Sequence, residues 1–209
     1  MCGRYSALTE DEIIEIREIL KKLSLHIVRD EFLEYNEENG EICPTDFAPV
    51  ISKNEKGIYF EKLKWGFKKW DDSGVIINAR CETIKIRSTF SSLIKSSRCI
   101  VPTTGFFEWE KLKKGKKKHF IKDKKDNILF MAGLYRDTTD GREFVIITKK
   151  AFNEMENIHD RMPVILKEEQ IEEWLSGKLS AEDLEKLDFD VKIAPHEEKS
   201  YDNGQMSLF

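Results

Sequence analysis

The chain has few cysteines, and none of them are closely paired. The four are scattered through 209 residues without a C-x-x-C spacing, at Cys2, Cys43, Cys81 and Cys99. Structural zinc sites and disulfide frameworks need closely spaced or regularly paired cysteines, so neither is expected. The sequence therefore predicts reduced thiols, no bound metal and no other cofactor.

Long apolar runs are also absent. The longest runs, such as residues 75–77 and 144–147, have the length of strands, and charged residues make up 35% of the chain. A membrane-spanning helix needs about 20 predominantly apolar residues. The start of the chain does not resemble a signal peptide, because an acidic stretch follows at Glu10, Asp11 and Glu12. We expect a soluble cytoplasmic protein that does not contact membranes.

The chain contains no internal repeat and no low-complexity linker, which favours a single domain. Its length suits one hydrophobic core. We expect one mixed α+β domain over residues 1–195, with largely antiparallel strands. Residues 196–209 are polar, and we expect them to form a flexible tail.

Local patterns locate the helices and strands. Thr9 and Glu12 form a capping box in front of apolar residues at helical spacing, which predicts a first helix. Glycine-containing turns then separate short apolar runs, and residues 106–130 have the pattern of a meander of three strands. Further helical segments are expected at residues 90–95, 151–157, 168–175 and 181–187.

Charge is distributed unevenly along the chain. The net charge is −4, but residues 1–150 carry +5 and residues 151–209 carry −9. The overall sign argues against a protein that coats nucleic acid by bulk charge alone. The uneven distribution is compatible with a basic face that binds nucleic acid, or with a solvated surface and an acidic tail.

Cysteine at position 2 has special chemistry if Met1 is removed, and a small second residue favours that removal. Cys2 would then be a 1,2-aminothiol. An α-amine has a pKa of about 7.7–8.0 against about 10.4 for lysine, so far more of it is unprotonated at neutral pH. The amine can form a Schiff base with an aldehyde, and the thiol can then close a five-membered ring on the same carbon. The alternative is a small residue that merely follows the initiator.

Three further segments carry side chains suited to catalysis or binding. Asn78 and Arg80 directly follow an apolar strand, and Glu108 stands beside aromatic residues. His159 and Arg161 lie in a short connection between a predicted helix and a strand, where functional side chains are common. Each also has a structural explanation: Asn78 as a turn cap, Glu108 as a solvent-facing carboxylate and His159 as a packing histidine.

Together with the N-terminal Met1-Cys2-Gly3-Arg4-Tyr5, these segments resemble the SRAP family, the SOS-response-associated peptidases understood as abasic-site processing proteins. The resemblance covers residues 1 to about 166. Its motifs include Trp65-Gly66, Asn78-Ala79-Arg80, residues 101–109, Ala132-Gly133-Leu134-Tyr135 and His159-Asp160-Arg161-Met162-Pro163. It implies a compact SRAP-like domain of curved, mostly antiparallel sheets with surrounding helices and a DNA-binding groove.

The resemblance implies a role in the DNA damage response: covalent capture of abasic sites in single-stranded DNA, with Cys2 ending as a stable thiazolidine. It implies Glu108 as general acid and base. Asn78 would hold the amino terminus or the attacked carbon in place, and His159 would assist sugar ring opening and slow reversal of the adduct. Peptidase-type removal of Met1 and a lyase-like activity are compatible with it, and the protein would be associated with DNA in the nucleoid.

The resemblance also implies DNA-contacting residues. Arg4, Arg80 and Arg161 match basic positions of the family motifs and are expected to bind phosphates next to the lesion. Weaker or more open candidates are Arg87 for phosphate and Trp70, Trp109 and Pro44 for stacking or wedging against bases. For the two tryptophans, burial in the core is the alternative. The lysines on the predicted hairpin turn would extend the electrostatic track or simply keep the loop soluble; they are Lys113, Lys114, Lys116, Lys117 and Lys118.

The match to the family weakens after residue 166. Residues 191–193 are compatible with the family's last strand, but Pro195-His196-Glu197-Glu198 replaces the asparagine- and arginine-containing segment that should follow. Lys149 stands where the family more often has a small or acidic residue, and it is a candidate phosphate contact. Residues Gln205 to Phe209 resemble a short peptide that binds a sliding clamp.

Three functions are compatible with these observations. The first is a covalent trap for abasic DNA. The second is a cysteine peptidase that uses Cys2, and the third is a non-catalytic binder of single strands or junctions. The peptidase is disfavoured because Cys2 has no free amine while it is linked to Met1, and because the Cys-His-Asn order of papain-like enzymes is missing.

Overall fold

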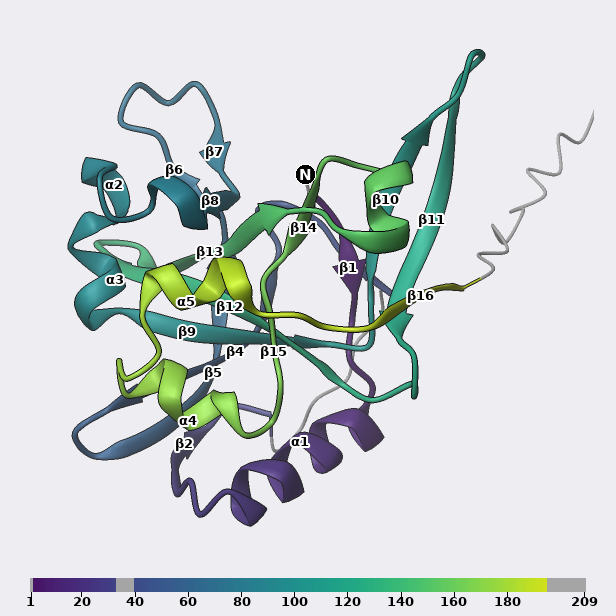
Figure 1. Ribbon diagram of the computed structural model, residues 1–209. Coiled ribbons are helices and arrows are strands. Elements are labelled where there is room, and N and C mark those ends of the chain that lie inside the picture. Colours follow the sequence, from purple (N-terminus) through teal and green to yellow (C-terminus); the bar gives the residue numbers. More distant parts are fainter. Residues whose placement is uncertain (1, 33–39, 195–209) are drawn as a thin grey trace, which may run out of the picture.

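The computed structural model describes residues 2–32 and 40–194 (Figure 1). Its centre is a large sheet with the strand order β14-β13-β12-β9-β4-β5-β2. Strand β5 also pairs with β13, so β13, β12, β9, β4 and β5 close into a ring. The strands of this sheet are β2 (Ile27–Asp30), β4 (Phe47–Asn54), β5 (Gly57–Trp65), β8 (Asn78–Arg80), β9 (Arg98–Thr103), β12 (Leu129–Thr138), β13 (Gly141–Lys150), β14 (Arg161–Pro163) and β15 (Ile165–Leu166).

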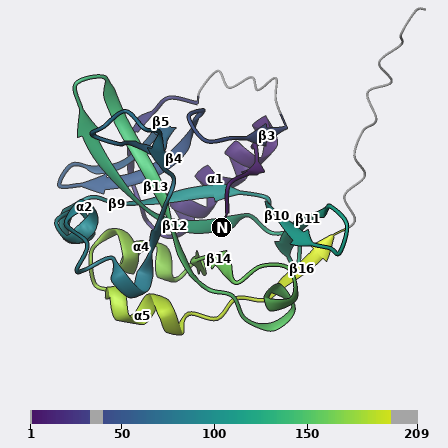
Figure 2. The same ribbon diagram turned by 90° about the horizontal axis from the view of Figure 1, so that it is seen from above.

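A second sheet has the order β16-β11-β10-β1-β3, and a third pairs β6 with β7. The β6–β7 and β10–β11 hairpins rise on either side of the N-terminal segment that enters β1 (Figure 1), and this segment lies centrally when the molecule is seen from above (Figure 2). The strands are β1 (Tyr5–Ser6), β3 (Glu41–Ile42), β6 (Phe67–Lys68), β7 (Val75–Ile76), β10 (Phe106–Lys111), β11 (Lys116–Asp123) and β16 (Val191–Ala194).

Helices cover the large sheet. Helix α1 (Glu10–Lys22) begins with the predicted capping box, in which Thr9 and Glu12 satisfy each other's backbone N–H groups. Its apolar stripe, which includes Ile13 and Ile16, is buried. Burial of each large apolar side chain stabilises the fold by roughly 2 kcal/mol. The other helical segments are η1 (Cys81–Thr83), α2 (Ser88–Ser91), α3 (Leu93–Ser96), η2 (Asn153–Asn157), α4 (Gln170–Leu175) and α5 (Ala181–Lys186). No helix of the described residues is long and apolar enough to cross a bilayer.

Two clusters of buried apolar side chains form the core. One packs the helices against the large sheet and includes Ile16 of α1 and Trp174 of α4. The other fills the space between the two main sheets and includes Tyr5, Trp65 and Phe106. Cys2 belongs to this second cluster, so the start of the chain is packed into the interior.

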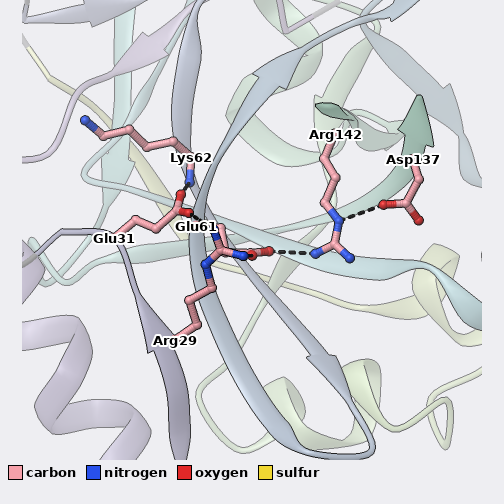
Figure 3. Close-up of polar contacts among 6 residues, drawn as sticks. All are labelled: Arg29, Glu31, Glu61, Lys62, Asp137 and Arg142. Carbon is pink, nitrogen blue, oxygen red and sulfur yellow. Dashed lines mark hydrogen bonds and ion pairs between the residues drawn. The ribbon is translucent and has the colours of Figure 1, made fainter. Parts of the chain in front are cut away.

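A buried carboxylate joins the strands near the point where the ring closes (Figure 3). The side chain of Glu61 in β5 is 6% exposed and lies 2.7 Å from Arg142 of β13 and 3.2 Å from Arg29 of β2. Arg142 also binds Asp137 of β12 at 2.8 Å, and Arg29 binds Glu31 at 2.6 Å. The Glu61 carboxylate therefore connects β5 to β2 and β13, and Arg142 extends the network to β12.

Most of the predicted elements are confirmed, including α1, α5 and the final strand β16. The one helix predicted at residues 90–95 is instead two short helices, α2 and α3. The meander over residues 106–130 is wrong in its third strand. Strand β11 pairs with β10 and β16, whereas β12 pairs with β9 and β13 in the other sheet. Residues 129–135 of β12 are all buried, as a central strand requires. A turn at Asp126, with φ of +61°, carries the chain from one sheet to the other.

Candidate functional site

The Cys2 side chain lies in the interior of the protein. The residue is fully buried, and its thiol points toward the carbonyl oxygen of Arg4 at 3.9 Å. Burial raises the pKa of this thiol, and the nearby Glu108 carboxylate raises it further. Cys2 therefore stays protonated at neutral pH, as a thiol and not as a thiolate.

Asn78 holds the backbone at Cys2. Strand β8 runs parallel to β13, with Asn78 opposite Ile146, and this pairing fixes the backbone position of Asn78. Its side-chain nitrogen Nδ2 donates a hydrogen bond of 2.8 Å to the carbonyl oxygen of Cys2. The other amide atom, Oδ1, is buried and accepts no hydrogen bond from the described residues. One acceptor is thus available beside Cys2.

Glu108 reaches the same place from the second sheet. The residue lies in the middle of β10 and is only 2% exposed. Strand β1 pairs with β10 through Tyr5 and Phe106, and the Phe107 amide donates to the Arg4 carbonyl at 2.9 Å. This register sets Glu108 beside the segment that precedes Arg4. The structure therefore brings Cys2, Asn78 and Glu108 together, from three segments far apart in the sequence.

His159 and Arg161 lie, as predicted, between η2 and β14. The imidazole is partly exposed, and its Nδ1 accepts a hydrogen bond of 3.0 Å from the backbone N–H of Arg161. A carboxylate oxygen of Asp160 lies 2.9 Å from the same nitrogen. The same ring nitrogen thus lies beside both the Arg161 amide and the Asp160 carboxylate, which fixes the orientation of the imidazole.

The sequence of this chain matches the model of a known protein family. The family model described as SOS response associated peptidase (SRAP) matches residues 1–201. The chain belongs to the SRAP family. The match continues past residue 166, so the segment whose motifs are weak, including β16, still lies within the SRAP domain.

Relatives of this SRAP chain are known in sequence and in structure. It is 36% identical over 192 residues to abasic site processing protein YoqW of Bacillus subtilis, covering 85% of this chain and 81% of the relative. It is 27% identical to abasic site processing protein YedK of Escherichia coli, covering 90% and 85%. A crystal structure of a protein from Bacteroides thetaiotaomicron has the same fold, with a TM-score of 0.72, 24% identity and coverage of 93% and 92%.

The four candidate phosphate-binding arginines of the SRAP chain differ in their surroundings. Arg80 and Arg87 are exposed, and within the described residues neither side chain makes a hydrogen bond or ion pair. Arg161 is largely buried and forms two contacts with the Glu82 carboxylate, at 2.5 and 2.9 Å. Arg4 is paired with Glu41 at 2.9 Å. Two of the four guanidinium groups are therefore held by carboxylates of the protein itself.

The candidate stacking residues are also in different environments. Trp70 is 96% exposed in the turn between β6 and β7, which excludes the core explanation for this residue. Trp109 is partly buried, with the guanidinium of Arg4 over its ring at 5.6 Å. Pro44 is partly buried in the loop between β3 and β4, next to Thr45 with φ of +81°.

Two polar residues near Glu108 were missed by the sequence analysis. His119 of β11 lies directly opposite Glu108 across the hairpin, and its Nε2 is 2.9 Å from a carboxylate oxygen of Glu110. Residues two apart on a strand share a face, so Glu108 and Glu110 point the same way. The hairpin turn at Gly115, combined with the alternation of side chains along each strand, would have placed His119 opposite Glu108.

The remaining observations concern Lys149, potential metal ligands and the C-terminal tail. Lys149 is wrong as a phosphate contact, because it is 5% exposed and donates to the backbone carbonyl of Leu187. Among the described residues, no group of His, Cys, Asp and Glu side chains is arranged to hold a metal ion. The tail at 196–209, with the clamp-binding pattern from Gln205 to Phe209, lies outside the described part of the chain.

Proposed function

We propose that this SRAP protein captures abasic sites in single-stranded DNA by a covalent bond to Cys2 after Met1 has been removed. The observation that carries the proposal is the hydrogen bond from Asn78 to the Cys2 carbonyl beside the buried Glu108. It holds the amino-terminal residue in place next to an acid–base group. The names of the relatives YoqW and YedK, both abasic site processing proteins, support the same substrate.

The chemistry begins at the free amine of Cys2. The amine attacks the C1′ aldehyde of the ring-opened sugar and gives a carbinolamine, which loses one water to form a Schiff base. The Cys2 sulfur then adds to the same carbon, and its proton passes to the nitrogen. The product is a thiazolidine ring, and no oxidant or reductant is consumed. A protonated thiol suits this order, because the amine acts first and the sulfur closes the ring.

Each proton transfer needs a group close to the reacting atoms. Glu108, buried beside Cys2, would accept the amine proton and protonate the leaving hydroxyl. Asn78 orients Cys2 through Nδ2, and its buried Oδ1 is an acceptor for the new amino group. His159 is assigned to sugar ring opening and to reversal of the adduct, which suits a partly exposed imidazole.

DNA would approach from the side on which the two hairpins flank the N-terminal segment (Figure 1). Arg80 and Arg87 are exposed and would bind phosphates directly, while Arg4 and Arg161 would exchange a carboxylate partner for phosphate. Trp70 offers an open ring for stacking, and Trp109 and Pro44 offer partly buried ones. The lysine-rich β10–β11 turn extends the positive charge.

The cysteine peptidase alternative is weaker. Such an enzyme attacks with a thiolate, and its cysteine usually lies in an electropositive setting that lowers the thiol pKa. Cys2 is in the opposite setting, because burial and Glu108 both raise the pKa of its thiol. Among the described residues, that environment favours the aminothiol chemistry over thiolate chemistry.

The test uses single-stranded DNA that carries one abasic site, mixed with the protein and with its Cys2→Ser variant. The products are heated in denaturant and separated on a gel. We expect a shifted band for the wild-type protein only, because the variant can form no more than a reversible Schiff base that heating removes. Both proteins should bind the intact strand equally well. A shifted band of equal intensity for Cys2→Ser would reject the thiazolidine, and no band for either protein would support the non-catalytic binder.

A further inference from the structure

Two cations converge on one carboxylate at the edge of the second sheet. Glu41 of β3 accepts a hydrogen bond of 2.9 Å from Arg4 and one of 2.6 Å from Lys118 of β11. Arg4 and Lys118 use different oxygens of that carboxylate. The Glu41 carboxylate is therefore a planar anion that accepts a hydrogen bond from one cation at each of its two oxygens.

Aromatic rings form the floor beneath both cations. The guanidinium of Arg4 lies 5.6 Å and the ammonium of Lys118 lies 5.8 Å from the centre of the Trp109 ring. Lys118 is also 4.4 Å from the ring of Phe107. Trp109 and Lys118 are direct partners in the β10–β11 register, so the strand pairing itself sets their separation. Cation–π contacts of this kind orient the positive groups.

The balance of charge leaves this cluster positive. Two cations share one carboxylate, and the Lys118 side chain is 13% exposed, so its charge is poorly screened by solvent. Burial acts to raise the pKa of Glu41, but the hydrogen bonds from Lys118 and Arg4 outweigh it and hold that pKa below its usual value. Glu41 is therefore ionised at neutral pH and fills the place between the cations.

We propose that Arg4 and Lys118, above Trp109, form a binding site for a backbone phosphate of the DNA strand, and that Glu41 occupies this site while DNA is absent. The inference rests on the proposed function and adds Lys118 and Glu41 to it. Arg4 is two residues from Cys2, at most about 7 Å along an extended chain, so the site lies next to the captured sugar. A phosphodiester has the same charge as a carboxylate and accepts the same two donors.

Displacement of Glu41 has a predictable cost. Each DNA molecule that binds must break two ion pairs within the protein before its phosphate can accept from the same two donors. Removal of the Glu41 charge abolishes that cost and leaves both donors free. If Glu41 instead only supports Arg4 in the correct orientation, its removal would weaken DNA binding. The two roles thus predict opposite changes in DNA affinity when the Glu41 charge is removed.

The experiment measures binding of an intact fluorescent single strand, which forms no covalent adduct, over a range of salt concentrations. Glu41→Gln should tighten binding about 3- to 10-fold at low salt, and Lys118→Gln should weaken it by a similar factor. The slope of log K against log salt should change by about 0.7 for each DNA phosphate that a variant newly neutralises or no longer neutralises. In the Lys118→Gln background, Glu41→Gln should tighten binding less, because one of the two released donors is missing.

Glu18→Gln and Lys21→Gln are the matched controls. Glu18 and Lys21 also form an ion pair, at 3.8 Å, but they lie on α1, on the other side of the molecule from the N-terminal segment (Figure 1). We expect less than a twofold change for either control. Thermal unfolding of each variant verifies that it is folded.

Weaker binding by a folded Glu41→Gln variant would overturn the proposal, as would Lys118→Gln with wild-type affinity and salt slope. Covalent capture is scored separately on a strand with an abasic site. If the wild-type protein forms no covalent adduct but the variants show the predicted changes in affinity, the proposed function is rejected and the phosphate site is retained. If the wild-type protein forms the adduct but the variants bind the intact strand with wild-type affinity, the phosphate site is rejected and the proposed function is retained.

Discussion

Asn78 donates a hydrogen bond of 2.8 Å to the carbonyl oxygen of Cys2, although 76 residues separate them in the sequence. The contact joins Cys2 to the strand that lies beside β13 in the large sheet. It holds a backbone oxygen of Cys2, not the amine or the thiol. In the proposed mechanism, the amine and the thiol of Cys2 could therefore turn toward one carbon while the backbone stays in place.

Loss of this contact should slow capture without preventing DNA binding. We expect Asn78→Ala to lower the single-turnover rate of adduct formation about tenfold, which corresponds to one hydrogen bond of roughly 1.4 kcal/mol. Affinity for an intact strand should change less than twofold. A variant that reacts at the wild-type rate would show that Asn78 does not position Cys2.

Glu108 should matter far more than the neighbouring carboxylate on its strand. We expect Glu108→Gln to slow adduct formation by about 10²- to 10⁴-fold, because the isosteric amide cannot exchange protons in the neutral range. Glu110→Gln is the matched control, since Glu110 is on the same face of β10 and is more exposed. Equal rates for the two variants would remove Glu108 from the mechanism.

The Cys2 thiol should be unreactive toward alkylating reagents in the folded chain that retains Met1. Its pKa is raised in the folded state, so the thiolate fraction at pH 8 is smaller than in the unfolded chain and grows only at more alkaline pH. Iodoacetamide labelling, followed by peptide mass spectrometry with and without urea, measures this difference. Rapid labelling of folded Cys2 at pH 8 would instead support a thiolate nucleophile and the peptidase alternative.

The Glu61 network should contribute to the stability of the ring of strands. We expect Glu61→Gln to lower the free energy of unfolding by about 2 kcal/mol, since the buried carboxylate accepts a hydrogen bond from Arg142 and forms an ion pair with Arg29 (Figure 3). Asp137→Asn removes an exposed carboxylate from the same network and should cost less than about 0.5 kcal/mol. Urea denaturation of both variants tests the comparison, and equal costs would contradict it.

Local sequence signals located much of the fold. The capping box at Thr9 and the glycine turn of the β10–β11 hairpin depend on a few adjacent residues, and both are confirmed. The ring closure between β5 and β13 joins residues about 80 positions apart, and no local periodicity encodes such a pairing. The same reason explains the error in the meander, where apolar spacing could not reveal which sheet β12 joins.

The site divides in the same way. Motifs identified Cys2, Asn78 and Glu108, because each stands in a short segment with unusual residues. Their contacts with other residues were not predictable. Glu41 lies near the site because β3 pairs with β1, and Glu82 belongs to it because its carboxylate contacts Arg161. Ion pairs between distant segments depend on tertiary structure, and these pairs determine which of the four arginines lack a carboxylate partner within the described residues.

The most direct test of the central claim is the intact mass of the product formed on a strand with one abasic site. Two proteins are compared: one whose chain starts at Cys2, and one that carries an additional residue in front of it. The account predicts, for the first, a heat-stable species with the summed mass of protein and DNA less one water. It predicts no such species for the second. An equally stable adduct from the extended protein, or none from the protein that starts at Cys2, would contradict the account.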